Sequence, residues 1–258
     1  MSQSTVVFIT GVSKGIGRGL VEAYLARPNH LVIGSLRDLA ASTAELESLQ
    51  TASGSKVLLV QIENTSVKDP KQALDVVRAA GIEHIDIFIA NAGGTPPVVS
   101  LEGVHPRDLL TAFHTNAASA LLLFQTFRPL LQAAPSPKWA SISSNSASLA
   151  LMGEMSSFIV PAYGVSKIAL NWLTHALHHS QDFLIALTLH PGHVQTVPGN
   201  WIARQVGMEK APTTVADSAA SIIRVIDQAT RETSSGKFID VLQAGQRDPV
   251  VEATVDAV

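Results

Sequence analysis

The alternation of strand-like and helical segments predicts an α/β fold: a doubly wound parallel seven-stranded sheet with helices on both faces. Short β-branched and aromatic runs alternate with helical segments along the whole chain, and this alternation is typical of βαβ units. No linker, internal repeat or low-complexity segment divides the 258 residues. We therefore expect a single domain over residues 1–258, ending in a tail of about residues 244–258 with little pattern.

The expected strands are short apolar runs bounded by glycine, proline or polar residues, as is typical of buried parallel strands. They are residues 6–9, 31–35, 56–61, 85–90, 138–143, 183–189 and 237–242. The expected helices are residues 20–25, 40–50, 69–80, 108–134, 161–180 and 216–229. Helix 69–80 opens on Asp69-Pro70 and closes at Gly81. Segment 108–134 is expected to hold two helices that meet near residues 114–116.

Residues 144–160 and 193–212 follow neither period and are expected to be irregular. Each stretch follows a strand, so both lie at the carboxyl edge of the sheet, where doubly wound proteins bind their ligands. Four large apolar side chains fall in these stretches: Met152, Met155, Phe158 and Trp201. They either line an apolar pocket or cover the core beneath long loops.

The composition excludes several classes of protein. The formal net charge is -3 and no basic stripe with interleaved aromatic residues occurs, so nothing indicates a nucleic-acid partner. The absence of cysteine excludes disulfides, thiolate metal sites and a cysteine nucleophile. No apolar run approaches the ~18 residues of a membrane span, and the N-terminus has no signal-peptide pattern. We expect a cytoplasmic protein without membrane association.

A glycine-rich loop, Gly11-Val12-Ser13-Lys14-Gly15-Ile16-Gly17, joins the first expected strand to the first expected helix. Glycines let backbone N–H groups approach a pyrophosphate, with the helix N-terminus behind them. A glycine-rich turn alone is equally compatible with a plain tight turn, but its position after the first buried strand favours a nucleotide. The Walker pattern is absent, which argues against an NTPase.

The end of the second expected strand selects the cofactor in dinucleotide-binding folds. An NAD-specific site has an acidic residue there for the ribose 2′-hydroxyl. This chain has Ser35-Leu36-Arg37 instead. Arg37 and Lys14 could pair with a 2′-phosphate, although both could also be solvated surface cations. The missing acid and the two cations favour NADP(H).

Tyr163 and Lys167 lie one turn apart on the same face of expected helix 161–180. An ammonium beside a phenol favours the phenolate, so the pKa of Tyr163 is expected to fall from its ordinary value near ~10. Tyr163 would then be a general acid or base near neutral pH. A helical tyrosine with a solvated lysine is the alternative, because most such pairs do no chemistry.

Taken together, the chain resembles the short-chain dehydrogenase/reductase family over about residues 4–242. The matching motifs are Thr10-Gly11-x-x-x-Gly15-Ile16-Gly17, Asn91-Ala92-Gly93, Asn116, Ile142-Ser143-Ser144, Tyr163-x-x-x-Lys167 and Pro191-Gly192-x-Val194-x-Thr196. Their joint occurrence in this order is very specific. The resemblance implies a Rossmann-type fold and an NAD(P)-dependent oxidoreductase that acts on a small carbonyl or alcohol.

The resemblance also implies a role for each matching residue. Tyr163 would be the acid/base, and Lys167 would bind the nicotinamide ribose and depress the pKa of Tyr163. Ser144 would hydrogen-bond the substrate carbonyl, and Asn116 would hold a water in a proton relay. The remaining contacts would be made to the cofactor: by Asn91, Ala92 and Gly93 beside its adenosine half, and by Val194 and Thr196, after Pro191-Gly192, at its nicotinamide end.

The chain departs from the family pattern in three places, one of which is a C-terminal tail without the family's usual ending. The gap from Ser144 to Tyr163 is long, and four serines compete for the serine role: Ser143, Ser144, Ser146 and Ser148. Ser144 is preferred because it follows the strand directly. Glu63, followed by Asn64, stands where the family has an aspartate beside the adenine; the longer carboxylate could still reach the adenine amino group.

Three histidines, His175, His178 and His179, lie at helical spacing on helix 161–180. A metal cluster would need a further ligand, so a solvated or subunit-facing patch is the preferred interpretation and no metal is expected. The family packs this helix and the preceding one against a second subunit, which implies a homodimer or homotetramer.

We expect an NADPH-dependent carbonyl reductase with an apolar or aromatic substrate. Ile142-Ser143-Ser144 and residues 190–196 look similar to fungal-type ketoreductases of secondary metabolism and to related carbonyl reductases. Alcohol oxidation with NAD(P)+ uses the same residues and is the alternative reaction. A dinucleotide-binding regulator without catalysis is the alternative class, but it would not need Asn116, Ser144, Tyr163 and Lys167 together.

Overall fold

The computed structural model describes residues 4–244 and confirms the predicted fold class. One seven-stranded sheet has the order β3-β2-β1-β4-β5-β6-β7, and every neighbouring pair is parallel. The strands are β1 (Thr5–Thr10), β2 (His30–Leu36), β3 (Lys56–Gln61), β4 (Ile87–Ala90), β5 (Lys138–Ile142), β6 (Ile185–His190) and β7 (Phe238–Asp240). The order reverses between β1 and β4, so the ligand crevice is expected beyond the carboxyl ends of these two strands.

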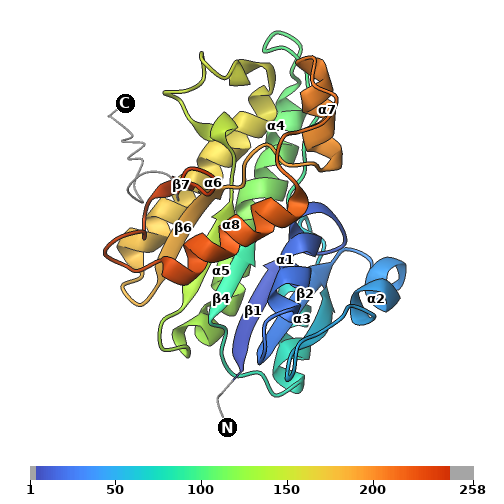
Figure 1. Cartoon of the computed structure of the whole chain (residues 1–258). Helices are drawn as coiled ribbons and strands as arrows, with labels where there is room; N and C mark the ends of the chain where they lie inside the picture. Colours follow the sequence, from blue (N-terminus) through green and yellow to red (C-terminus); the bar gives the residue numbers. More distant parts are fainter. Residues whose placement is uncertain (1–3, 245–258) are drawn as a thin grey trace.

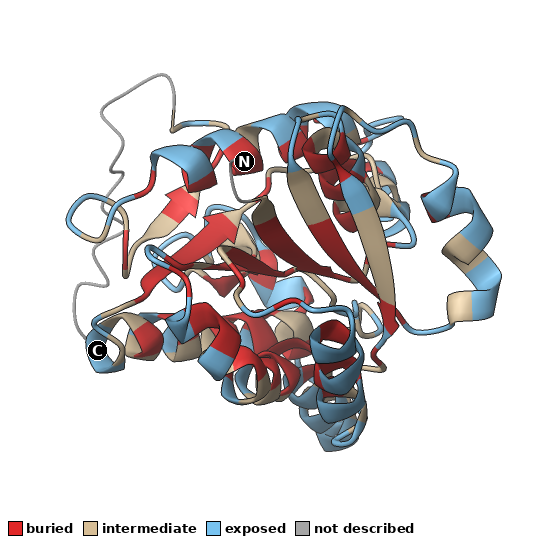
Figure 2. Ribbon diagram, turned by 90° about the horizontal axis from the view of Figure 1, so that it is seen from below, coloured by how far each residue is buried: buried red, intermediate tan, exposed pale blue. Residues whose placement is uncertain are grey.

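Helices cover both faces of the sheet (Figures 1 and 2). They are α1 (Gly15–Leu25), α2 (Leu39–Glu47), α3 (Asp69–Ala79), α4 (Pro106–Phe113), α5 (Ser119–Gln132), α6 (Pro161–Ser180), α7 (Val197–Gln205) and α8 (Val215–Gln228). A π-helical turn, His114–Ala118, joins α4 to α5, and short 3-10 turns at Asn145–Ala147 and Ser157–Ile159 precede α6. The expected tail, residues 244–258, lies outside the described residues except for Ala244.

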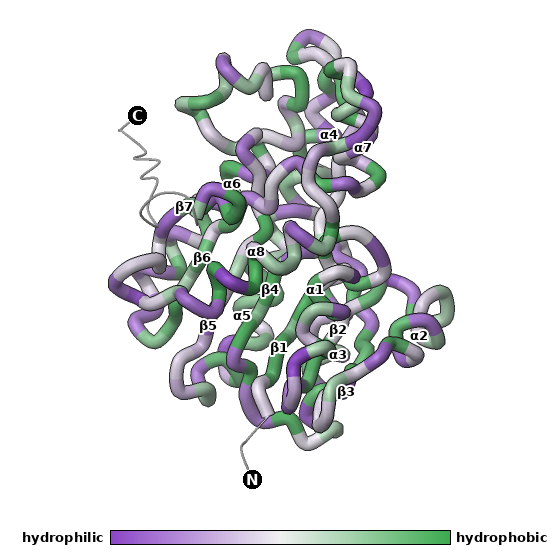
Figure 3. Tube along the Cα trace, in the orientation of Figure 1, coloured by the Kyte–Doolittle hydropathy of each residue, from purple (hydrophilic) through white to green (hydrophobic). Residues whose placement is uncertain are grey.

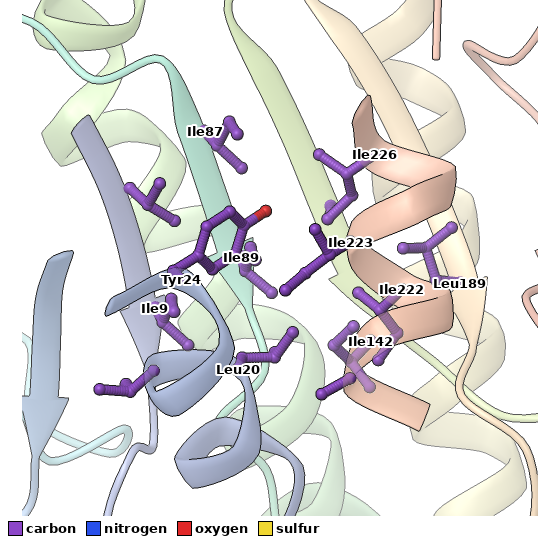
Figure 4. Packing of buried hydrophobic residues seen from close by; sticks show 14 of the residues in the cluster. Ile9, Leu20, Tyr24, Ile87, Ile89, Ile142, Leu189, Ile222, Ile223 and Ile226 are labelled. Atoms are coloured by element: carbon purple, nitrogen blue, oxygen red, sulfur yellow. The ribbon is translucent and has the colours of Figure 1, made fainter. Parts of the chain in front are cut away.

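Alternate residues of each strand enter two separate hydrophobic clusters, as the two-residue period of a strand requires. On β1, Val7 and Ile9 join the cluster beneath α1 and α8, whereas Val6 and Phe8 join the one beneath α3, α5 and α6. Figure 4 shows the first cluster, where Leu20 of α1 and isoleucines of the neighbouring helix α8 pack on the same face of the sheet. The hydropathy of the chain follows this plan, because the central strands are its most continuously apolar parts (Figure 3). A two-sided core therefore holds the strand ends in fixed positions.

The structure corrects part of the expected irregular stretch 193–212, because residues Val197–Gln205 form helix α7. The Thr196 hydroxyl caps this helix by accepting from the Gly199 amide at 3.1 Å, and a proline lies in its first turn. The helix exposes Val197 and Trp201, so it lacks the one-sided apolar pattern that predicts surface helices. Segment 108–134 divides as predicted, with the π-helical turn at the expected junction.

Candidate active site

The glycine loop packs so closely on the residues after β4 that only glycine fits at its key positions. Gly11 and Gly15 have φ of +71° and +59°, a backbone conformation that residues with a side chain rarely adopt. A Cβ on Gly17 would lie 2.2 Å from the Gly11 carbonyl oxygen, and one on Gly11 would lie 2.9 Å from the Ala92 Cα. The loop therefore makes a tight turn that packs directly on the residues after β4.

Thr10 and Asn91 lock the ends of β1 and β4 together. The Thr10 hydroxyl accepts hydrogen bonds from the Asn91 and Ala92 amides at 3.0 and 2.9 Å. In return, the Asn91 Nδ2 donates to the carbonyls of Thr10 and Gly11 at 2.8 and 3.3 Å. Gly93 continues this segment toward the catalytic candidates, since a Cβ there would lie 2.9 Å from Asn116 Oδ1.

The N-terminus of α1 lies behind the glycine loop. Helix α1 begins at Gly15, and its N-cap residue Lys14 makes no side-chain capping bond. Unsatisfied first-turn amides and the helix dipole favour an anion at this end. The exposed Ser13 and Lys14 side chains flank it. This tight glycine turn and the helix N-terminus behind it form a backbone cradle that fits the pyrophosphate of a dinucleotide.

At the adenosine end, Arg37 follows β2 and its side chain is 81% exposed. Its Nε lies 3.8 Å from Glu63 Oε2, so the two residues predicted to meet the adenosine do lie close together. Asp38, the next acidic residue along the chain, is engaged elsewhere, because its carboxylate caps α2 by accepting from Ala40 N at 3.0 Å. Asn64 is also engaged: its amide donates to the carbonyls of Ala92 and Thr115 at 3.2 and 3.1 Å.

Lys167 is buried beneath Tyr163 on α6. Lys167 is only 5% exposed, and its Nζ donates to the Ile142 carbonyl at 2.8 Å. The same Nζ lies 5.7 Å from the centroid of the Tyr163 ring. Burial lowers the pKa of Lys167 to about 8, because a low-dielectric surrounding disfavours the ammonium.

The expected fall in the pKa of Tyr163 is wrong for this structure. Burial raises the pKa of Tyr163, and a hydrogen bond with the Ser144 hydroxyl only partly opposes that rise. The ammonium of Lys167 donates to the Ile142 carbonyl at the end of β5, and it is not among the groups that lower the pKa of Tyr163. The spacing on the helix placed both residues on one face but did not determine where the long lysine side chain points.

The four candidate serines occupy different environments. Ser143 Oγ donates to Asn171 Oδ1 at 2.5 Å, and Ser148 Oγ accepts from the Leu151 amide at 3.2 Å. Ser144 accepts from the Ser146 amide at 3.1 Å, and its hydroxyl is near enough to the Tyr163 phenol to act on the pKa of Tyr163. Among these serines Ser144 is the one whose hydroxyl the structure links to Tyr163.

Asn116 lies in the π-helical turn and is 2% exposed. Such turns occur often at functional sites. Its Nδ2 donates to Gly94 O and to Ser166 Oγ, both at 2.9 Å, while its Oδ1 accepts from Gly94 N at 2.8 Å. Ser166 Oγ in turn donates to the Tyr163 carbonyl at 2.7 Å. Asn116 thus reaches the backbone of Tyr163 through Ser166, a residue that the sequence reasoning missed although it lies inside the Tyr-x-x-x-Lys motif.

The segment after β6 returns to the glycine loop. Gly192 has φ +88°, and its Cα approaches Leu242 so closely that a Cβ would lie 2.4 Å from Leu242 Cδ1. The buried Val194 forms a parallel bridge with Thr213, which closes the excursion through α7. A Cβ on Gly15 would lie 3.2 Å from Thr196 Cγ2. Pro191, Gly192, Val194 and Thr196 therefore lie on one path between β6 and the predicted pyrophosphate cradle.

Two of the three histidines of α6 bind the loop before β7, and the third, His179, bonds His175 at 3.1 Å. His175 Nδ1 bonds Gly236 O and His178 Nδ1 bonds Ser235 Oγ, both at 2.8 Å. Within residues 4–244, no group of three or more ligand-type side chains is arranged to hold a metal ion. These histidines attach the end of α6 to the C-terminal part of the fold.

A family model described as short chain dehydrogenase matches residues 5–205. The chain belongs to the short-chain dehydrogenase/reductase family. It is 52% identical over 246 residues to the short-chain dehydrogenase srdF of Neurospora crassa, covering 94% of this chain and 96% of that one. It is 38% identical over 239 residues to the norsolorinic acid ketoreductase of Aspergillus parasiticus, covering 92% of this chain and 88% of that one.

Solved structures of the family agree with the fold. A chicken fatty liver carbonyl reductase with bound NADPH aligns with a TM-score of 0.81 at 25% identity and covers 93% of each chain. The chain belongs to this family, and its relatives include ketoreductases and carbonyl reductases. It is therefore an oxidoreductase that acts on carbonyl or CH–OH groups. Its fold binds a nicotinamide dinucleotide, and its substrates are small molecules. In the described part of this short-chain dehydrogenase, no helix is long and apolar enough to cross a membrane.

Proposed function

We propose that this protein reduces the carbonyl of an apolar or aromatic ketone or aldehyde to an alcohol, with NADPH as the preferred cofactor. One observation carries the proposal: Tyr163, Lys167 and the Ser144 hydroxyl meet at the carboxyl edge of the sheet. The glycine cradle lies at the same edge. One relative is named a norsolorinic acid ketoreductase, which supports the direction of reduction. The similar carbonyl reductase with bound NADPH supports the cofactor.

A bound nicotinamide supplies the hydride, and the protein supplies position and charge. Tyr163 donates its proton to the substrate oxygen as negative charge develops there, and Ser144 steadies the same oxygen with its hydroxyl. A raised pKa suits this role, since it keeps the phenol protonated until the oxyanion forms. Lys167 binds the nicotinamide ribose with the ammonium hydrogens that Ile142 does not use. The relay water at Asn116 stays a prediction, because the Asn116 side chain already bonds Gly94 and Ser166.

The serine assignment predicts an ordered series of losses. Ser144→Ala should lower kcat about 10²- to 10³-fold, as expected on removal of one hydrogen-bond donor to a developing oxyanion. Ser146→Ala and Ser148→Ala are the matched controls and should stay within a few-fold of wild type. Steady-state kinetics on one ketone with all three variants measures this. A larger loss in either control than in Ser144→Ala would move the role to that serine.

Arg37 is proposed to select NADPH. The Asp38 carboxylate caps its own helix, and the Glu63 carboxylate lies beside Arg37 as an ion-pair partner. The Arg37 side chain is 81% exposed, so its guanidinium can still meet a 2′-phosphate. Arg37→Asp should lower kcat/KM for NADPH about 10- to 100-fold, since a hydrogen bond to a charged group contributes roughly 1.5–3 kcal/mol. The same variant assayed with NADH is its internal control and should lose little. Equal kcat/KM for the two cofactors in wild type would contradict this assignment.

The substrate is proposed to be apolar because large apolar side chains stand exposed at the edge where the site lies. They are Leu149, Leu151, Met155, Phe158 and Ile159 before α6, and Val197, Trp201, Val206 and Met208 on and after α7. Both segments project from the same end of the molecule (Figure 1). A panel of ketones, aldehydes and the matching alcohols, assayed with both cofactors, tests the function. Bulky aryl ketones should be reduced most efficiently, and faster turnover of small polar alcohols with NAD+ would favour the oxidative alternative.

A homodimer or homotetramer is proposed from the outer face of α5 and α6. Leu121, Val165 and Trp172 are exposed there, and Trp172 is 69% exposed. A small apolar cavity of about 10 Å³ between the two helices and the sheet is lined by residues that include Leu121, Leu173 and the buried Trp139. Exposed apolar side chains such as Leu121, Val165 and Trp172 mark association sites. A cytoplasmic location stays a separate prediction.

A further inference from the structure

Strand β6 ends at His190, beside the turn that carries Ser144. The Ser143 amide donates to the Leu189 carbonyl at 2.7 Å and so extends the β5–β6 ladder by one bond. In a parallel ladder the next donor, the Asn145 amide, would bond the carbonyl of Pro191. In this structure that carbonyl accepts from the Ser218 hydroxyl at 2.8 Å. The Asn145 amide bonds another acceptor instead.

The imidazole of His190 is that acceptor. The Asn145 amide donates to His190 Nδ1 at 3.3 Å. Asn145 is the first residue of a 3-10 turn, so its N–H has no partner inside that turn. The Ser144 hydroxyl accepts from the Ser146 amide of the same turn. The residues on either side of Ser144 are thus both held by β6, one through a backbone carbonyl and one through a side chain.

The bond requires a neutral ring, because a protonated imidazole has no lone pair to accept with. Burial lowers the pKa of His190 to about 4, with Asp240 of β7 acting to raise it and His193 acting to lower it. The ring therefore stays neutral through the ordinary working range, with its proton on Nε2 and Nδ1 free to accept.

We propose that His190 is a positioning residue that holds the Ser144 turn so that the serine hydroxyl faces Tyr163. His190 does so through the Asn145 amide, without contact with the substrate. The proposal rests on the role of Ser144 in the proposed function.

A matched pair of substitutions at position 190 tests it. His190→Leu removes the acceptor, whereas His190→Asn, of similar size, places an amide oxygen near the position of Nδ1. His190→Leu should lower kcat about 10- to 100-fold, the cost of misplacing a catalytic group by a fraction of an ångström to one ångström, with KM for NADPH unchanged. His190→Asn should restore kcat to within a few-fold of wild type. Equal losses in both variants would overturn the proposal.

A double-mutant cycle separates this proposal from the function on which it rests. If His190 acts through Ser144, His190→Leu should cost little further activity in the Ser144→Ala background. A full loss in both backgrounds would show that His190 acts elsewhere. A Ser144→Ala enzyme with wild-type kcat would instead remove the serine from the proposed function.

Substitution of the donor gives a second route that leaves the histidine intact, should His190→Leu fail to fold. Asn145→Pro deletes the N–H at the first position of a turn, which proline tolerates, and Ser144 before it is extended at φ -159° and ψ 148°, as a residue before proline prefers. Asn145→Ala keeps the N–H and is the control. Asn145→Pro should lose kcat as His190→Leu does, and full activity in Asn145→Pro would overturn the proposal.

Discussion

Replacement of Tyr163 by phenylalanine is expected to lower kcat about 10²- to 10⁴-fold, the usual contribution of a positioned general acid. The ring remains, so the packing of α6 and the affinity for NADPH should stay close to wild type. Single-turnover reduction of a ketone gives the rate, and fluorescence titration with NADPH gives the binding constant.

The only other tyrosine of the chain supplies the control. Tyr24 lies on the buried face of α1, and its hydroxyl is buried without a hydrogen-bond partner among the described residues. Tyr24→Phe should leave kcat unchanged, because it removes a hydroxyl remote from the site. Full turnover in Tyr163→Phe would place the acid on another residue and would reopen the interpretation of the chain as a cofactor-binding regulator.

Replacement of Lys167 by methionine is expected to remove activity and to raise stability. In the folded protein burial lowers the pKa of Lys167 from 10.5 to about 8. Near neutral pH the folded state therefore holds an ammonium that the unfolded chain would keep hydrated. At about 1.36 kcal/mol for each pKa unit, this opposes folding by roughly 3 kcal/mol, a cost that methionine avoids at similar volume.

The sign of the pH dependence follows from linkage. Between about pH 8 and 10.5 the unfolded state binds more protons at Lys167 than the folded state does, so the free energy of unfolding of wild type rises with pH. The stability gap between Lys167→Met and wild type should therefore narrow as pH rises from 7 to 9.5. Urea unfolding at several pH values measures it. Lys71→Met, at an exposed lysine of α3, is the control and should change stability by less than about 0.5 kcal/mol; a constant gap for Lys167→Met would mean that the ammonium is well solvated.

The architecture could be predicted because it depends on patterns repeated along the chain. The alternation of apolar strand-like runs and helical segments predicted the strands and their parallel direction. The π-helical turn lies at the junction that was predicted near residues 114–116. Helix α7 was missed because its capping residue Thr196 is a single local signal, and its exposed Val197 and Trp201 break the pattern of an amphipathic helix.

The hydrogen-bond partners of individual polar side chains could not be predicted. Ser143 is bound to Asn171, and Asn64 to Thr115; each pair is far apart in sequence, and nothing local determines which partner a short polar side chain finds. The pKa of Tyr163 was predicted with the wrong sign for a related reason. Helical spacing determines which residues share a face, but only the folded packing determines burial and the direction of the Lys167 side chain.

The bridge between Val194 and Thr213 has a consequence for protein engineering. The Thr213 amide donates to the His193 carbonyl at 3.1 Å and the Gln195 amide donates to the Thr213 carbonyl at 2.8 Å, so both ends of the α7 excursion are fastened to each other. Residues 197–212 can then be exchanged as a cassette for the corresponding segment of a relative, because the splice points lie on a fixed frame. Such chimaeras would let turnover of new ketones be selected without rebuilding the sites for the cofactor and the proton.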